Sequence, residues 1–276
     1  MKVGQDVGGW VWSFSPFVDY GIISLLLFTQ VFIMLPTKRK LEQISPAAVV
    51  ESNLEKLLGD DLALVRQTIQ EKALTGYPLV DGVLADAVPE HFPRAIITLG
   101  TSRLGHSQQK KRVALASAIE LLHIAVNIHD FIPRGPVAAT EQNRVLMGSA
   151  ILIGDYCFGQ ASILAATTEK PEVVAAFADA LAKLSERRVT TLLETPEMPH
   201  ADSSILYAAA AEAGGLLAGL PRPVRYTLKE ASASFGEVLT DSETSVTEAI
   251  LHLEALIGER PAVKPLATWL RTHRPA

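Results

Sequence analysis

The spacing of apolar residues along this chain is that of helices rather than strands. One helical face is formed by four apolar residues at steps of four, four and three: Val173, Phe177, Leu181 and Leu184. No sustained alternation of apolar and polar residues, the pattern of a half-buried strand, is present. Further helices are predicted over roughly 46–58, 60–74, 93–104, 109–131, 141–166, 208–218, 223–240, 249–257 and 263–273. One large all-α domain is the simplest organisation.

Several helix ends carry recognisable capping residues. Pro171 lies where the first turn of a helix tolerates proline. Gly219, followed closely by two prolines, ends the alanine-rich helix at 208–218. Ser245 and Glu248 form a capping box ahead of the helix at 249–257. These signals predict successive helices with short joints.

The first 40 residues differ from the domain at 41–276. Residues 20–35 carry no charge, tryptophans precede them, and a basic cluster follows them. This arrangement favours a membrane anchor whose C-terminal side is cytoplasmic, but the apolar run is shorter than the ~20 residues of a spanning helix. The alternatives are a helix buried in a partner or dimer interface, and a start at Met34. The membrane interpretation predicts a cytoplasmic protein attached to the cytoplasmic membrane face through residues 10–35.

Composition excludes several classes of function. The net charge is −5, so the chain lacks the basic field that holds nucleic acid. Cys157 is the only cysteine, which excludes an intramolecular disulfide and a thiolate zinc site and fits a reducing, cytosolic compartment. Because it lies in an apolar helix, we expect an inert structural thiol. No P-loop, dinucleotide-binding, nucleophile-elbow or H-E-x-x-H motif occurs.

Four polar residues share one face of the otherwise apolar helix at 109–131, at steps of three, four and three: Glu120, His123, Asn127 and Asp130. Polar groups on an inward face need partners, because burying one unpaired costs about 1–3 kcal/mol. The spacing fits a functional site in a helical core. It also fits a satisfied polar network or a solvated face.

A second segment, 145–164, combines glycines with a single charge. Gly148, Gly154 and Gly159 permit close contact with a neighbouring helix, although each costs ~1 kcal/mol of helix propensity. Asp155 is a lone charge among apolar neighbours, and we expect it to be a hydrogen-bonded structural carboxylate.

Together these segments resemble the trans-isoprenyl diphosphate synthase (polyprenyl synthetase) family. That family's pattern runs E-L-x-H, H-D-D-x-x-D, R-R-G and then a helix with G-D-Y. Here the matching residues are Glu120 to His123, then His129-Asp130, Arg134-Gly135 and Gly154-Asp155-Tyr156. Arg94 resembles the second basic residue of the family's G-K-x-x-R-P motif, and 207–220 resembles its alanine-rich helix. The resemblance covers about residues 40–273.

The resemblance implies an isoprenoid-synthase-like bundle of helices around a central apolar cavity. In that family two facing aspartate motifs hold magnesium ions, which bind the diphosphate of an allylic substrate. Carried over by position, Asp130 would be a metal ligand, and Glu120 and His123 would join it as vestigial catalytic residues. The substrate-binding residues implied are Arg94, Arg134 and Asn127.

The chain departs from the family pattern where charge should be densest. Phe131 replaces the second aspartate of the first motif, and Pro133 or Arg134 replaces the third. The second motif is absent near 235–246, where only Asp241 and Glu243 remain, and the lysine of the first basic motif is His91 or lost. One aspartate cannot hold a metal cluster, so we expect no prenyl transfer by this chain alone.

Three functions follow from this pattern. The first is a non-catalytic or regulatory subunit of a heteromeric polyprenyl diphosphate synthase, whose partner is a catalytic synthase subunit. The second is an active prenyltransferase with an altered site, condensing isopentenyl diphosphate with an allylic diphosphate. The third is an isoprenoid- or lipid-binding protein. Mg²⁺ enters only if the chain is active or through the catalytic partner.

Overall fold

The computed structural model describes residues 53–130, apart from 74, 78–79, 82–83 and 85–86, together with 140–193, 201–236 and 262–272. All of them belong to one compact unit, Lys40–Ala276. Several sequence-based predictions lie outside the described residues. They are the membrane-associated segment 10–35, Arg134, the degenerate second motif with Asp241 and Glu243, and the helix at 249–257.

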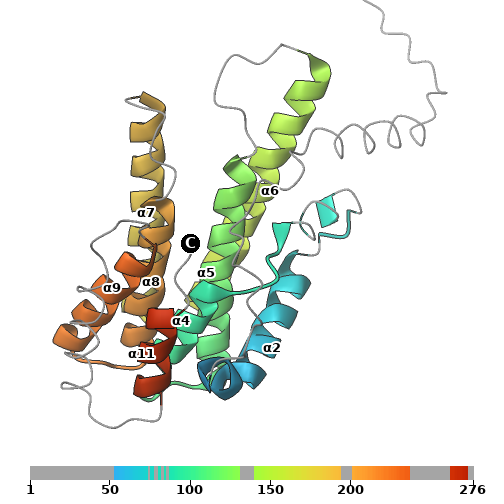
Figure 1. The fold of residues 1–276 in the computed structure, drawn as a ribbon. Coiled ribbons are helices and arrows are strands. Elements are labelled where there is room, and N and C mark those ends of the chain that lie inside the picture. Colours follow the sequence, from blue (N-terminus) through green and yellow to red (C-terminus); the bar gives the residue numbers. More distant parts are fainter. Residues whose placement is uncertain are drawn as a thin grey trace, which may run out of the picture. The chain divides into compact units, whose positions relative to one another are not determined.

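The described residues form helices and no strands (Figure 1), which confirms the all-α prediction. The helices are α2 Asn53–Ala73, α4 Pro93–Ser102, α5 Gln109–Asp130, α6 Glu141–Ala166, α7 Pro171–Leu193, α8 Ala201–Leu217, α9 Arg222–Gly236 and α11 Val263–Thr272. The helix predicted at 141–166 agrees with α6 at both ends, and Pro171 is the first residue of α7, as expected.

One predicted boundary is wrong. The sequence suggested separate helices at 46–58 and 60–74, but α2 continues through Gly59 without a break. Leu54, Leu58, Val65 and Ile69 are all fully buried and recur at helical spacing across the glycine. Burial of each such side chain contributes about 1.5–3 kcal/mol, which outweighs the ~1 kcal/mol helix cost of one glycine.

The end of α8 depends on Gly219, as predicted. Its φ of 70° lies in the left-handed region that favours glycine. The Gly219 N–H donates to the Leu216 carbonyl at 3.1 Å, and the Leu220 N–H donates to the Gly215 carbonyl at 2.9 Å. This is the double hydrogen bond of a Schellman cap, and buried Leu220 closes it against the core.

Two helices form the centre of the domain. α5 packs against α2, α4, α6 and α8, and α8 packs against α4, α5, α7 and α9 (Figure 1). Because α5 is covered on most sides, its residues are apolar nearly all round. By length and composition α5 and α6 could each cross a membrane, but α5 is plainly a core helix, with 78% of its apolar window buried.

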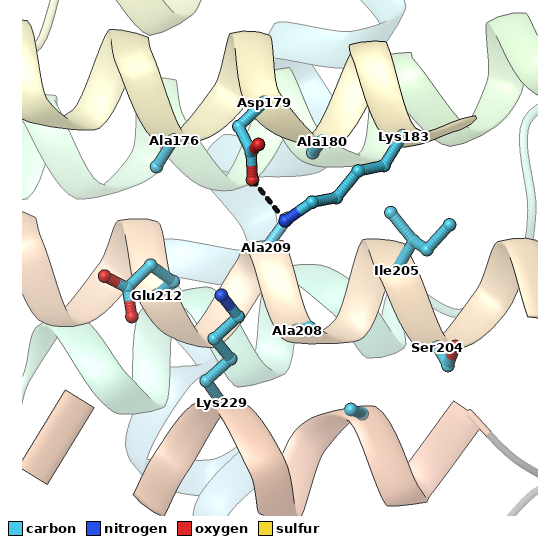
Figure 2. A pocket seen from close by; sticks show the side chains of 11 residues that line it. Ala176, Asp179, Ala180, Lys183, Ser204, Ile205, Ala208, Ala209, Glu212 and Lys229 are labelled. Carbon is cyan, nitrogen blue, oxygen red and sulfur yellow. Dashed lines mark hydrogen bonds and ion pairs between the residues drawn. The ribbon is translucent and has the colours of Figure 1, made fainter. Parts of the chain in front are cut away.

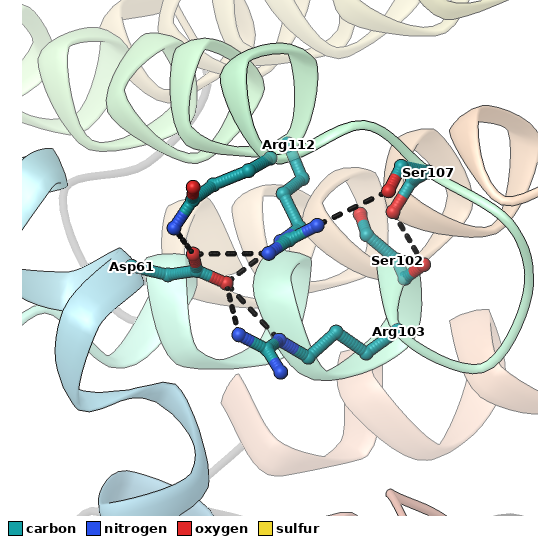
Figure 3. A network of polar contacts seen from close by, with 6 residues as sticks. Asp61, Ser102, Arg103, Ser107 and Arg112 are labelled. Atoms are coloured by element: carbon teal, nitrogen blue, oxygen red, sulfur yellow. Dashed lines mark hydrogen bonds and ion pairs between the residues drawn. The ribbon is translucent and has the colours of Figure 1, made fainter.

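A carboxylate joins three segments at one end of this core (Figure 3). Asp61 of α2 is fully buried and accepts hydrogen bonds from Arg103 at 3.0 and 2.8 Å, from Arg112 at 2.7 and 3.1 Å, and from Gln109 at 2.8 Å. Burial raises the pKa of Asp61, but these hydrogen bonds together outweigh it and leave the pKa lowered. The ionised carboxylate therefore fastens α2 to α5 and to the turn after α4.

The contact between α5 and α6 involves one of the three glycines that the sequence singled out. A Cβ at Gly154 would overlap the His129 ring, so this glycine does permit a close approach. No atom of the described residues lies within 4 Å of a Cβ built at Gly148 or Gly159, so this part of the chain gives neither glycine a close contact. Asp155 was expected to be a hydrogen-bonded structural carboxylate, but it lies at the surface. Its side chain is exposed and lies 3.5 Å from His129 Nε2.

Candidate functional site

The predicted polar stripe runs along α5 from the core to the surface. Glu120 is fully buried, His123 and Asn127 are partly buried, and Asp130 is exposed at the last residue of the helix. The four side chains share a face, but each meets different surroundings and different partners.

Glu120 caps the N-terminus of the neighbouring helix α4. Phe92, the residue that precedes α4, offers no capping side chain. Glu120 Oε1 instead accepts a hydrogen bond at 2.8 Å from the Ala95 N–H, one of the free donors of the first turn. Burial raises the pKa of Glu120, while the charge of Arg94 and the backbone N–H groups of Ala95 and Arg94 lower it to a smaller extent. The raised pKa favours the protonated acid more than in water, and Oε2 has no hydrogen-bond partner among the described residues.

Arg94, predicted to bind substrate, is 4% exposed. The carbon of its guanidinium lies 4.7 Å from the ring centroid of Tyr207 on α8, which is a cation–π geometry. Its Nε has no hydrogen-bond partner in the described part of the chain. The positive charge thus stacks on an aromatic face, and it lowers the pKa values of Glu120 and His123 on α5.

His123 and Asn127 bond to each other. His123 Nε2 lies 3.1 Å from the side-chain nitrogen of Asn127. Burial, and next to it the positive charge of Arg94, lower the pKa of His123 well below its usual value, so the ring is neutral at pH 7. With Nε2 unprotonated, the ring accepts a hydrogen bond from the Asn127 amide. This pair is a satisfied polar contact of the kind that the sequence left open.

Asp130, the predicted metal ligand, faces an arginine from a distant segment. Arg188 Nη2 of α7 donates to Asp130 Oδ2 at 2.9 Å and reaches the Val126 carbonyl at 3.4 Å. The Asp130 side chain is 40% exposed and that of Arg188 is 24% exposed. The residues stand 58 positions apart in the chain, so helix spacing gave no signal for this pair.

The described residues do not form a magnesium site. A cation with oxygen ligands needs one or two carboxylates at each position besides its waters. Asp130 offers one, and Arg188 already bonds to it. In the described ranges no group of three or more His, Cys, Asp or Glu side chains could hold a metal ion.

A shallow cavity of about 220 Å³ lies apart from this stripe, between α7, α8 and α9 (Figure 2). Alanines form much of its lining, and an ion pair between Lys183 and Asp179 at 2.6 Å lies along one wall. Glu212 and Lys229 face it from the other helices. None of the predicted site residues lines this cavity.

Sequence reasoning missed three residues that define these surroundings: Arg188, Tyr207 and Asp61. Tyr207 was noted only as the start of an alanine-rich helix. The signal for Asp61 was present, because it falls at helical spacing between Leu58 and Val65 on the buried face of α2.

The inert-thiol prediction is confirmed, since Cys157 is fully buried and burial raises the pKa of its thiol to about 12.

Comparison with known proteins identifies the fold. No protein-family model matches the sequence, and neither does any curated protein. Solved structures do match. A polyprenyl synthase from Caulobacter crescentus, complexed with calcium and isoprenyl diphosphate, aligns with a TM-score of 0.56 and 22% identity over 72% of this chain. The aligned region spans 64% of that protein's length.

Two other solved structures agree with this result. An isoprenoid synthase family member from Thermotoga neapolitana aligns with a TM-score of 0.61 and 18% identity over 77% of this chain and 98% of that one. A deletion mutant of the heterotetrameric geranyl pyrophosphate synthase of mint gives a TM-score of 0.54 and 13% identity over 78% and 99%. The chain therefore has the fold of the isoprenyl diphosphate synthases, as the sequence resemblance predicted.

Proposed function

We propose that this chain is a non-catalytic or regulatory subunit of a heteromeric polyprenyl diphosphate synthase. Its fold is that of such synthases, and one protein of similar fold is itself a heterotetrameric synthase. The proposal needs a fold that can pair with a catalytic subunit and a site that does not itself bind the metal–diphosphate unit.

The observation that carries the proposal is the ion pair between Asp130 and Arg188. Asp130 is the single aspartate that remains of the first motif, and a guanidinium lies 2.9 Å from its carboxylate. A magnesium ion at Asp130 would have to displace this cation or bind beside it, and Phe131 supplies no second carboxylate. An internal arginine thus provides the positive charge that a metal would provide in a synthase.

The surroundings of Arg94 support the same proposal. A residue that binds a diphosphate has to present its guanidinium to solvent or to a cavity. Arg94 is 4% exposed, stacks on Tyr207 and faces Glu120. Its cation–π contact joins α4 to α8.

A reconstitution assay tests the proposal. The full chain is incubated with Mg²⁺, labelled isopentenyl diphosphate and farnesyl diphosphate, first alone and then with a catalytic prenyl synthase subunit from the same cell. We expect no product from the chain alone, and a change in the rate or product length of the catalytic subunit when the chain is added. Turnover by the chain alone would contradict the proposal, and so would a catalytic subunit that is unaffected by it.

Two matched variants show which subunit carries the catalytic aspartate. Asp130→Asn in this chain should leave the activity of the reconstituted complex within about twofold, because an exposed ion pair contributes only about 0.2–1 kcal/mol. The equivalent Asp→Asn change in the first motif of the catalytic subunit should abolish activity. If Asp130→Asn abolishes it instead, Asp130 is a metal ligand and the second function, an active prenyltransferase, is the correct one.

We also propose that residues 10–35 attach the complex to the cytoplasmic face of the membrane, because their uncharged run is followed by a basic cluster. Flotation of the full chain with liposomes, compared with a chain that starts at Met34, measures this directly. Equal flotation of the two chains would refute it.

A further inference from the structure

A second cavity, here called the Arg103–Arg112 cavity, lies at the end of the core where Asp61 joins α2 to α5. Its volume is about 230 Å³, and it is lined by Leu57, Arg103, Gly105, Ser107, Arg112 and Ala262. Two of these six residues are cations and none is acidic. The arginines hold Asp61 in place (Figure 3), but that role does not require them to border a cavity.

The positive charge of this cluster is not balanced within it. Both guanidinium groups bond to the same carboxylate, with Asp61 Oδ2 lying 2.8 Å from Arg103 Nη2 and 2.7 Å from Arg112 Nε. The pKa of Asp61 is lowered, so its carboxylate is ionised at pH 7. One negative charge therefore faces two positive charges, whereas the charge of Arg188 is matched one for one by Asp130.

The cations lie between the carboxylate and the cavity. Arg103 and Arg112 line the cavity and their side chains are 28% and 14% exposed, whereas Asp61 does not line it and is 0% exposed. Arg103 uses Nε and Nη2 to bond Asp61, and its Nη1 has no hydrogen-bond partner in the described part of the chain. An anion that enters the cavity would thus meet N–H donors before it meets the carboxylate.

The turn that carries these donors is held in place. Ser107 Oγ donates to the Ser102 carbonyl at 2.8 Å, and Arg112 Nη1 donates to the Ser107 carbonyl at 3.1 Å. Gly105 packs so closely on Ala218 that a Cβ at this position would overlap the Ala218 carbonyl. Donors that are already fixed lose little conformational freedom when a ligand binds, so the cavity wall is pre-organised.

Positive charge is also concentrated in the sequence at this position. Residues 103–112 read RLGHSQQKKR and contain four Lys or Arg and no Asp or Glu, in a protein of net charge −5. Lys110, Lys111 and Arg112 lie in the first turn of α5, which has no acidic residue. Cations are disfavoured there, because the N-terminus of a helix is itself positive. An anion in the cavity would offset this repulsion.

We infer that the Arg103–Arg112 cavity binds the phosphate group of a phosphate monoester. A phosphate has several acceptor oxygens, so it can bond to guanidinium groups from two different segments at once. Leu57 and Ala262 provide apolar wall for the rest of the ligand. The inference goes beyond the proposed function and does not depend on it, since the site requires neither a catalytic subunit nor an isoprenoid.

Titration of the full chain with inorganic phosphate, followed by calorimetry at constant ionic strength, tests the inference. Wild type should bind phosphate saturably. Leu57 is 38% exposed, so Leu57→Glu should fold, and its carboxylate would compete with phosphate for the arginines. We expect the affinity for phosphate to fall roughly tenfold or more. Leu57→Gln, which has the same size without the charge, should stay within about threefold of wild type.

Leu64→Glu is the matched control for position. Leu64 lies about two turns further along α2, is 40% exposed and does not line the cavity. Its affinity for phosphate should stay within about twofold of wild type. The absence of saturable binding by wild type, or an equal loss in Leu57→Glu and Leu64→Glu, would overturn the inference.

Vesicles distinguish a soluble phosphate ester from a lipid headgroup. The full wild-type chain and Leu57→Glu are floated with phosphatidylcholine vesicles, with and without phosphatidic acid, whose headgroup is a phosphate monoester. If the ligand is a headgroup, phosphatidic acid should increase flotation of wild type more than that of Leu57→Glu. An equal increase in both, with phosphate binding in solution that depends on Leu57, would assign the site to a soluble ester. Neither assay measures turnover, so failure here leaves the proposed function standing.

Discussion

Replacement of Asp61 is the sharpest test of how the core is held together. Asp61→Asn keeps the size of the side chain but removes the charge that accepts five hydrogen bonds from Arg103, Arg112 and Gln109 (Figure 3). It also turns an amide N–H toward the guanidinium groups. Two arginines then remain beside α2 without their shared counter-charge.

The magnitude follows from the burial of the three side chains. Removing one partner of a buried ion pair costs about 3–5 kcal/mol. The side chains of Arg103 and Arg112 are 28% and 14% exposed, so water can partly solvate both after the change. We therefore expect a loss at the low end, about 3 kcal/mol, out of the 5–15 kcal/mol of a typical domain. This corresponds to a fall in Tm of roughly 6–12 °C.

Urea unfolding followed by circular dichroism measures the loss, with Asp60→Asn as the matched control. Asp60 is the neighbouring residue in α2, is exposed, and should tolerate the change within about 0.5 kcal/mol. Equal effects of the two substitutions would refute the reasoning.

The pH dependence gives a second check on Asp61. Because the pKa of Asp61 is lowered in the fold, its contribution is present above the ordinary value of 3.8 and is lost as the pH falls through the folded value. The stability gap between wild type and Asp61→Asn should be constant at pH 6–8 and close at strongly acid pH. A gap that persists in acid would mean that the charge of Asp61 is not its source.

Three further predictions concern the helix contacts. Gly154→Ala should destabilise the domain by about 1–3 kcal/mol in the same urea assay, because the new Cβ overlaps the His129 ring. Gly59→Ala, which has open space around it, should instead stabilise the domain by up to ~1 kcal/mol. The free energy of unfolding of Glu120→Gln should rise relative to that of wild type as the pH rises above 4.5, because the raised pKa of Glu120 makes its ionisation unfavourable in the fold. A difference between the two proteins that does not change with pH would contradict this. Cys157 should not react with a thiol reagent at pH 8 until urea unfolds the chain, because its thiol is fully buried and its pKa is about 12.

Periodicity was sufficient to predict α7, because its buried residues Val173, Phe177 and Leu184 recur at helical spacing. α6 and the glycine end of α8 follow from local rules about spacing and caps. The continuity of α2 through Gly59 could not be predicted in this way. Whether a glycine ends a helix depends on how much apolar surface the helix buries on either side of it. That buried area is set by tertiary packing and cannot be read from the local sequence.

The sequence predicted which polar side chains share one face of α5, but it did not predict which residues they contact. Spacing placed Glu120, His123, Asn127 and Asp130 on one side of α5, and only the bond between His123 and Asn127 lies within that helix. The partners of the other two come from α4 and α7, at separations of 25 and 58 residues. No local rule links residues so far apart, so neither the capping role of Glu120 nor the pairing of Asp130 with Arg188 could be predicted from the stripe alone.

The way this chain places its cations bears directly on diphosphate binding. An anion binds tightly where positive charges are held ready and uncompensated. Arg188 already faces Asp130, and Arg94 already faces Tyr207 and Glu120. A diphosphate entering either position would have to exchange an existing intramolecular contact for a new one, so little net electrostatic energy would remain for binding. If a family aspartate were restored at Phe131, Arg188 would still compete with a metal ion for the carboxylate of Asp130. Adding Arg188→Ala to Phe131→Asp should raise the affinity for Mg²⁺ above that of either single variant, as measured by calorimetry. An equal affinity in the single and double variants would show that Arg188 does not exclude the metal.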